Sequence, residues 1–166
     1  MKKLIFVLTL AVACVCLANL FAQEFTYVGS AKCKMCHQTE AQGLQFPIWE
    51  GTAHAKTFEQ LSSDAGKALA ADAPENAKCL KCHAPLAEFK AEGVSCEVCH
   101  GPGSDYKSMT VMKDHAGSVA KGLIEYGSPD AIKKQCAGCH ENNPHDESFD
   151  FDAAWAKIKH IKPDAK

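Results

Sequence analysis

The stretch Cys33-Lys-Met-Cys36-His37 decides the fold of this 166-residue chain, because its pattern returns three more times. The other copies are Cys79-Leu-Lys-Cys82-His83, Cys96-Glu-Val-Cys99-His100 and Cys136-Ala-Gly-Cys139-His140. Cys-x-x-Cys-His is the attachment signature of c-type haem. Two thiols three positions apart can reach the two vinyl groups on one edge of a haem, while the next residue presents imidazole to the iron. The sequence therefore predicts four covalently attached haems.

The predicted cofactor-binding residues follow from these four copies. The thioether-forming cysteines are Cys33, Cys36, Cys79, Cys82, Cys96, Cys99, Cys136 and Cys139, and the proximal iron ligands are His37, His83, His100 and His140. Two other interpretations of the cysteines remain. The second and third pairs have a passable zinc-ribbon spacing, and disulfides are common in exported chains. Neither explains a histidine directly after every pair, so haem is preferred.

The N-terminal segment has the composition of a secretory signal peptide. Lys2 and Lys3 give it a positive charge, and a mostly apolar run leads to small residues at Ala18 and Ala22. We expect cleavage after Ala22, with Ala18 as the second choice. This divides the chain into a signal peptide (1–22) and a tetrahaem cytochrome c domain (23–166), and it predicts a periplasmic or otherwise exported bacterial protein.

Cleavage at this point also accounts for every cysteine. It removes Cys14 and Cys16, and the eight that remain are the number that four haems consume. A loose lipoprotein-type box before Cys14 is an alternative processing site, and its use would leave a lipid anchor on the membrane. Membrane contact is otherwise expected only through a quinone-linked partner.

The length of the mature chain limits how it can fold. Residues 23–166 provide about 36 residues for each haem, too few to build a large conventional core as well. The porphyrins must therefore supply most of the core, as metals do in other small folds. We predict a mainly α fold of short helices and loops wrapped around four closely packed covalent haems, with little or no sheet. The chain without haem is expected to be largely unfolded.

The charges exclude one class of partner. Beyond residue 22 the chain has 16 lysines, no arginine and 20 acidic residues, so it lacks the basic face that nucleic acid requires. Lysines do occur beside the haem motifs, at Lys32, Lys34, Lys78, Lys81, Lys133 and Lys134. Three roles are open for these lysines: pairing with haem propionates, forming a docking rim for an acidic redox partner, or lying on an ordinary solvated face. Acidic residues near the motifs are expected to be solvated.

Helical signals are short, and almost no alternating pattern predicts strands. Ser30 is expected to cap a turn that carries the first motif. A longer helix is expected to begin after Pro47, to carry His54, and to end near Gly66 or Pro74. The sequence Gly101-Pro102-Gly103 should stop the helix of the third motif.

Two helices are expected in the second half of the chain. Residues 104–120 can form a helix on which Met109, Met112 and His115 recur at three-residue intervals, with both methionines packed in the core. The last helix should follow Asp150 or Asp152, contain His160, and end before Pro163. The uneven spacing of the motifs, with 17 residues from Cys79 to Cys96, predicts that the second and third haems are neighbours.

Four further histidines are candidates for the second axial position of each iron. They are His54, His115, His145 and His160. Ligation of all four irons by two imidazoles would give low-potential electron carriers, since axial ligand identity is a main determinant of haem potential. His145 is the weakest candidate, because it lies in a polar loop five residues after His140; a solvent-facing histidine is the alternative there.

The chain resembles the tetrahaem cytochrome c-554 family, also called cytochrome c-554 and c-prime. The matching stretches are Tyr27-Val-Gly-Ser-Ala-Lys-Cys-Lys-Met-Cys-His37, Trp49-Glu-Gly-Thr-Ala-His54, Gly93-Val-Ser-Cys-Glu-Val-Cys-His-Gly-Pro-Gly103 and Phe149-Asp-Phe-Asp-Ala-Ala-Trp-Ala-Lys-Ile-Lys-His160. The resemblance implies a mostly helical fold with closely stacked porphyrins and a periplasmic redox role. It also implies that one haem is five-coordinate, which fits His145 being no ligand.

These observations favour a periplasmic respiratory electron carrier acting between donor and acceptor proteins that the sequence does not identify. An electron carrier is preferred to an enzyme because no catalytic acid–base pair, nucleophile or phosphate loop stands out. One alternative is a haem enzyme whose five-coordinate iron reduces nitric oxide or a related small nitrogen species. The other is a subunit of an extracellular cytochrome filament.

Overall fold

The computed structural model describes residues 24–141, 143–145 and 148–160, and the signal peptide predicted for residues 1–22 lies outside them. The described residues are mainly helical and form no strand, as predicted. The helices are α2 (Ser30–His37), η1 (Glu40–Gln42), α3 (Gln45–Glu50), η2 (His54–Lys56), α4 (Thr57–Leu61), α5 (Asp64–Leu69), α6 (Ala77–His83), η3 (Ala87–Glu92), α7 (Cys96–His100), α8 (Met109–Met112), α9 (His115–Ala120), α10 (Pro129–His140) and α11 (Phe151–Ile158).

Each haem motif lies at the C-terminal end of a short helix. The helices α2, α6, α7 and α10 all end at the histidine of their motif. On a helix, residues three and four positions apart share a face, so the first cysteine, the second cysteine and the histidine point to one side. Two of these helices have side-chain N-caps: Asn76 accepts from the Lys78 N–H, and Ser128 accepts from the Ala131 N–H.

The prediction of one long helix after Pro47 is wrong. This part of the chain instead forms four short helices, α3, η2, α4 and α5. The break after α3 lies at Gly51, where the Gly51 and Thr52 N–H groups turn back to the carbonyls of Pro47 and Trp49. Glycine favours such an ending because it loses more freedom in a helix than other residues. The break allows His54 to begin a new turn with its own orientation.

The second half of the chain differs from the prediction in a similar way. Residues 104–120 form two short helices, α8 and α9, instead of one. Met109 and Met112 are exposed, since α8 packs mainly on α9 at one end of the molecule. In α11 the predicted cap is confirmed, as the Asp150 carboxylate accepts from the Ala153 N–H at 3.1 Å. His160, however, lies just beyond the helix rather than within it.

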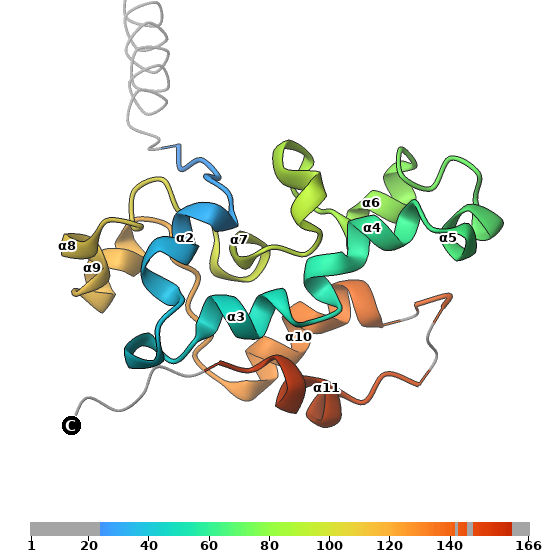
Figure 1. Cartoon of the computed structure of the whole chain (residues 1–166). Coiled ribbons are helices and arrows are strands. Elements are labelled where there is room, and N and C mark those ends of the chain that lie inside the picture. The colour runs from blue at the N-terminus through green and yellow to red at the C-terminus, as the bar shows by residue number, and fades with distance from the viewer. Residues whose placement is uncertain (1–23, 142, 146–147, 161–166) are drawn as a thin grey trace, which may run out of the picture.

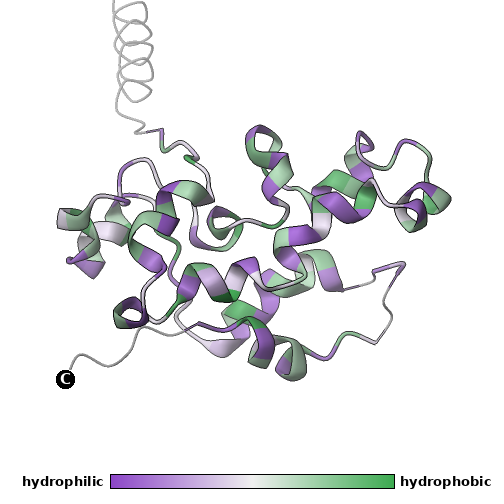
Figure 2. Cartoon of the chain, viewed as in Figure 1, coloured by the Kyte–Doolittle hydropathy of each residue, from purple (hydrophilic) through white to green (hydrophobic). Residues whose placement is uncertain are grey.

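The polypeptide itself provides a small apolar core. The buried apolar side chains in the described ranges are Phe46, Leu61, Ala73, Ala84, Leu86 and Tyr106. Figure 2 shows apolar and polar residues mixed along the helices, with no continuous apolar layer. This composition suits a fold whose interior is completed by prosthetic groups.

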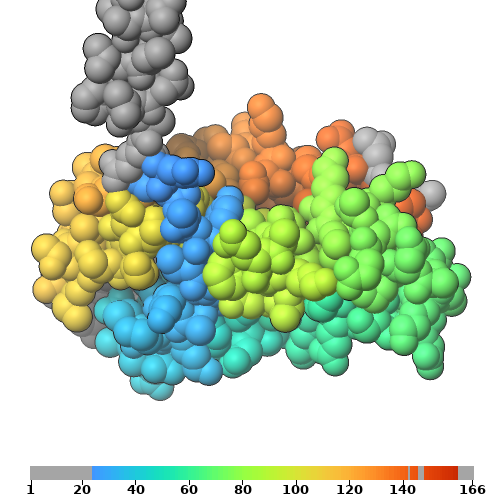
Figure 3. Space-filling model, turned by 90° about the horizontal axis from the view of Figure 1, so that it is seen from above, coloured from blue at the N-terminus to red at the C-terminus, as the bar shows by residue number. Residues whose placement is uncertain are grey.

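The four helices that carry the motifs are spread along the molecule, with α7 near its middle and α10 along one side (Figure 1). The helices α8 and α9 lie at one end with α2, and α4, α5 and α6 lie at the other, while α10 and α11 run along one side. Viewed from above, the N-terminal segment and α2 run between the α8–α9 region and η3 (Figure 3). The α2 helix packs on α3 and α7, and α4 packs on α5, α6 and η3.

Candidate haem sites

The thiols of different motifs meet in the structure. The Cys33 and Cys96 thiols share a hydrogen bond, which raises the pKa of Cys33 and lowers the pKa of Cys96 to about 7. The first and third motifs are therefore neighbours. Cys139 lies against Cys82 in the same way: burial and the Cys82 thiol raise the pKa of Cys139 to about 11. The second and fourth motifs thus form another pair.

A third contact joins these two pairs. Burial, followed by the nearby Cys136 thiol, raises the pKa of Cys99 to about 11. The Tyr126 hydroxyl donates to the Cys99 carbonyl at 2.7 Å, and the Gln135 side chain, on α10, donates to the Val98 carbonyl at 3.3 Å. The motifs consequently meet in the order first, third, fourth, second. Sequence spacing predicts that the second and third haems are neighbours, and Thr57 brings these two motifs near each other, since its hydroxyl lies 2.7 Å from the His83 carbonyl and accepts from the Val94 N–H at 3.1 Å.

Two of the additional histidines face proximal histidines. The rings of His54 and His140 have centroids 6.0 Å apart, and those of His100 and His160 are 5.9 Å apart. Two imidazoles on opposite sides of one metal ion, each with a metal–nitrogen bond of about 2 Å, have ring centroids roughly 6 Å apart. Phe149 stacks on His140 with a centroid distance of 4.1 Å. The geometry therefore fits an axial pair at the fourth motif and another at the third.

Hydrogen bonds at Nδ1 leave Nε2 for a metal in three histidines. His37 Nδ1 lies 2.9 Å from the Gln45 side-chain oxygen, and His83 Nδ1 lies 3.2 Å from the Thr57 carbonyl. His160 Nδ1 lies 3.1 Å from the Ile158 carbonyl. A carbonyl only accepts, so Nδ1 must carry the proton there and Nε2 keeps its lone pair. Such bonds orient metal-binding histidines in proteins generally.

Burial keeps two of the facing histidines neutral, the form that binds a metal. Burial is the main reason that the pKa of His100 is lowered to about 4, with His160 and His37 adding to the shift. The pKa of His54 is lowered by burial and then by His140. The same interactions show that His37 lies near the His100 pair, as expected for the adjacent first and third motifs.

The other two additional histidines have different surroundings. His115 is exposed, and its Nε2 lies 2.8 Å from a Glu125 carboxylate oxygen, which leaves Nδ1 as the ring nitrogen for any metal. It lies on α9, at the same end of the molecule as α2 (Figures 1 and 3). His145 is exposed in the loop after α10, and its backbone N–H donates to the Asn143 side chain. Neither histidine is paired with a proximal ring among the described residues.

One residue of these sites was missed by sequence reasoning. Glu97, inside the third motif, was expected to be solvated, but its side chain is 1% exposed. Its carboxylate accepts from the backbone N–H groups of Val28, Gly29 and Gly103, at distances between 2.6 and 3.1 Å. The signal that could have revealed it is the adjoining Gly101-Pro102-Gly103 turn, which brings backbone close to the motif. Of the lysines beside the motifs, Lys34 lies 3.8 Å from Glu50 and is exposed.

These residues fit c-type haem. Each motif places two thiols and an imidazole on one helical face, and paired imidazoles stand at the separation that a metal between them requires. The thiol contacts join Cys33 to Cys96 and Cys82 to Cys139, which is not the grouping that a zinc ribbon of the second and third motifs needs. Within the part of the chain that the structure describes, no helix is long and apolar enough to cross a membrane.

The comparison with known families agrees with this chemistry. Residues 32–101 match the family described as cytochrome c554 and c-prime. The match covers the first three motifs and His54, and it confirms the resemblance inferred from the sequence. Neither a curated protein nor a solved structure matches the chain. At the level that the family supports, the chain is a c-type cytochrome with covalent haem and an electron-transfer role.

Proposed function

Residues 32–101 belong to the cytochrome c554 and c-prime family, and from this premise we propose that the chain is a periplasmic tetrahaem electron carrier between two redox proteins. Haem c supplies a reversible one-electron couple at each attachment site. Each electron taken from the donor reduces one haem, and passing that electron to the acceptor reoxidises it, so the carrier returns to its starting state after one electron has entered and one has left.

The contacts between motifs carry this proposal. The first motif touches the third through Cys33 and Cys96, and the fourth touches the second through Cys139 and Cys82. The third and fourth motifs are joined where the Gln135 side chain, on α10, donates to the Val98 carbonyl, with Cys99 and Cys136 nearby. Attachment sites that meet in an unbroken series support electron passage from one end of the molecule to the other. The first and second motifs are the ends of this series, so we place the two partner proteins there.

The paired imidazoles support the same role. His140 with His54, and His100 with His160, would saturate the axial positions at the two central sites. A metal with both positions occupied by imidazole has no vacancy for a substrate, which favours electron transfer over catalysis. His115 remains the candidate for the first motif, to which its position beside α2 is suited.

Reductive titration of the exported protein tests the proposal. We expect one monomer to take up four electrons, and mass spectrometry to show the mature polypeptide with four haems. Uptake of fewer than four electrons, or a secreted chain without haem, would contradict it. Electron paramagnetic resonance of the oxidised protein should show low-spin signals for the third and fourth sites.

One observation favours a second candidate function. Among the described residues, the ring of His83 faces no second imidazole, and its Nδ1 is bound to the Thr57 carbonyl. The second motif is therefore the best candidate for a five-coordinate iron that binds and reduces nitric oxide or a related small nitrogen species. A high-spin signal that disappears on adding nitric oxide would support this, whereas an entirely low-spin protein whose spectrum does not respond would exclude it.

A further inference from the structure

Glu97 is a buried carboxylate at the junction of the first and third motifs. It directly follows Cys96, whose thiol contacts Cys33, and its side chain is 1% exposed. Backbone N–H groups approach both of its oxygens: Val28 approaches both, Gly103 approaches Oε1 and Gly29 approaches Oε2. Because every neighbour is a donor, the ionised, acceptor-only form satisfies all of these bonds.

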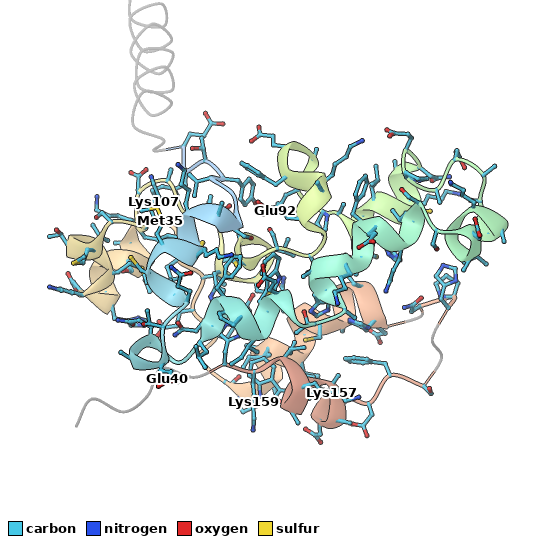
Figure 4. The ribbon with its side chains drawn as sticks, viewed as in Figure 1. Met35, Glu40, Glu92, Lys107, Lys157 and Lys159 are labelled. Atoms are coloured by element: carbon cyan, nitrogen blue, oxygen red, sulfur yellow. The ribbon has the colours of Figure 1, made fainter. Side chains whose placement is uncertain are left out.

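A second carboxylate stands beside it. Glu92, at the end of η3 and labelled in Figure 4, accepts from the Ser30 N–H at 2.9 and 3.1 Å. Ser30 is 2% exposed and is the first residue of α2, and its hydroxyl accepts from the Cys96 N–H. Glu97 and Glu92 together thus bind three consecutive N–H groups at the start of the helix that carries the first motif.

Among the residues that the structure describes, no cation forms an ion pair with either carboxylate. The ion pairs of the described residues involve Glu50, Glu75 and Glu125, and none includes Glu92 or Glu97. The effect of the charges reaches an attachment thiol: after the hydrogen bond with Cys96, burial and the charge of Cys96, Glu97 and Glu92 also raise the pKa of Cys33. A charge in a buried site acts more strongly than one in water, since the effective dielectric constant is lower.

We infer that the Glu97 and Glu92 carboxylates lower the reduction potentials of the haems on the first and third motifs. An iron porphyrin carries one more positive charge when oxidised than when reduced, so a fixed negative charge nearby stabilises the oxidised state. Glu97 should act more strongly than Glu92, because Glu92 is only half-buried and is better screened by solvent. This inference rests on the proposed tetrahaem electron-transfer function.

The test compares variants of the full, haem-loaded protein exported with its own leader. Glu97→Gln removes the charge, and Glu97→Asp keeps the charge while shortening the side chain. Glu92→Gln removes the second charge, and Glu88→Gln is the matched control, since Glu88 is exposed on the same turn, η3. The readout is the set of four midpoint potentials from spectroelectrochemistry, assigned to individual haems by the NMR signals of their methyl groups.

We expect Glu97→Gln to raise the potentials of the first and third haems and to leave the other two in place. Glu92→Gln should raise the same two by less, and Glu88→Gln should shift none. Glu97→Asp should lower the denaturation midpoint while keeping the potentials low, which separates the role of the charge from that of packing. A purely structural role predicts instead that the Asp and Gln variants change the potentials alike.

Three outcomes would overturn the inference. The first is that Glu97→Gln leaves the midpoint potentials unchanged, and the second is that it shifts the potentials of all four haems equally. The third is that Glu97→Asp shifts the potentials as far as Glu97→Gln does. If the Glu97→Gln protein fails to mature, the Glu92→Gln variant tests the inference instead. Unchanged midpoint potentials of the first and third haems in that variant would reject it. Failure of the proposed function is distinct, because it appears as fewer than four electrons taken up by the unmodified protein.

Discussion

The pair formed by the first and third motifs is assembled around one buried and one half-buried carboxylate, Glu97 and Glu92, whereas the pair formed by the second and fourth is held by Thr57. In the first pair, Glu97 and Glu92 bind the backbone at the start of α2. In the second pair, the Thr57 hydroxyl lies 2.7 Å from the His83 carbonyl and the Thr57 carbonyl binds His83 Nδ1. Near this second pair Lys81 is present, and it partly opposes the effect of burial and Cys82 on the pKa of Cys139.

This difference shows that two pairs with the same attachment chemistry can have different electrostatic surroundings. A carboxylate stabilises the more positive, oxidised state, and a lysine disfavours it. The third motif also differs from the second in connectivity, because it contacts both the first and the fourth. Changes in the third motif should therefore have wider consequences than changes in the second.

Removing one attachment site at a time should reveal this difference most strongly. Cys96→Ala with Cys99→Ala deletes the central contact, and we expect little or no folded, secreted protein, since about a quarter of the cofactor core is lost between two others. Cys79→Ala with Cys82→Ala deletes a terminal site, and we expect a folded protein that takes up three electrons. Mass spectrometry, thermal unfolding and reductive titration measure these effects. An equal loss of folded, secreted protein in the two double variants would contradict the inferred order of motifs.

Replacing one additional histidine in each pair tests the axial assignments. His54→Met should raise the potential of the fourth haem, and His160→Met that of the third, each by on the order of 0.1 V within the roughly 0.8 V that axial ligands span. The remaining three potentials should stay close to their original values. His145→Met is the control, because His145 is an exposed loop residue. A change at His145 as large as at His54 would show that the ring pairs were assigned wrongly.

The local parts of this arrangement were predictable from sequence, and the non-local parts were not. The motifs, their helices and the Asp150 cap depend on residues within a few positions of one another. The break at Gly51 was also local, but the apolar pattern on either side concealed it. In contrast, His54 meets His140 across more than eighty positions, and no pattern in the sequence assigns such a pair.

Glu97 illustrates the same limit for charge. Sequence alone places an acidic residue inside a short helix, where the usual expectation is solvent. Its donors come from Val28, Gly29 and Gly103, two of which are nearly seventy positions away. Burial of the carboxylate therefore depends on how α2 and α7 pack, which only the folded chain reveals.

Thr57→Val tests how the second pair is held. The Thr57 hydroxyl lies within hydrogen-bonding distance of the carbonyls of His83 and His54, and it accepts from the Val94 N–H. Valine has a similar shape and leaves these groups without their partner, so we expect the free energy of unfolding to fall by about 1–3 kcal/mol. Denaturant unfolding of the haem-loaded protein measures it. Thr52→Val is the control, because within the described part of the chain the Thr52 hydroxyl donates to one group, the nearby Trp49 carbonyl, and its loss should cost less.

The smallest effect is expected at the start of α11, which leads to His160. Asp150→Ala removes the carboxylate that accepts from Ala153, and loss of an N-cap costs about 1 kcal/mol. Asp150→Asn keeps an accepting oxygen and should lose only a small part of this stabilisation of the folded state. The two variants therefore separate the contribution of the hydrogen bond from that of the charge. If the Ala variant also weakens the low-spin signal of the third haem while the Asn variant does not, α11 positions His160 opposite His100. An unchanged signal in both would mean that His160 is held by its own contacts, chiefly the bond from Nδ1 to the Ile158 carbonyl.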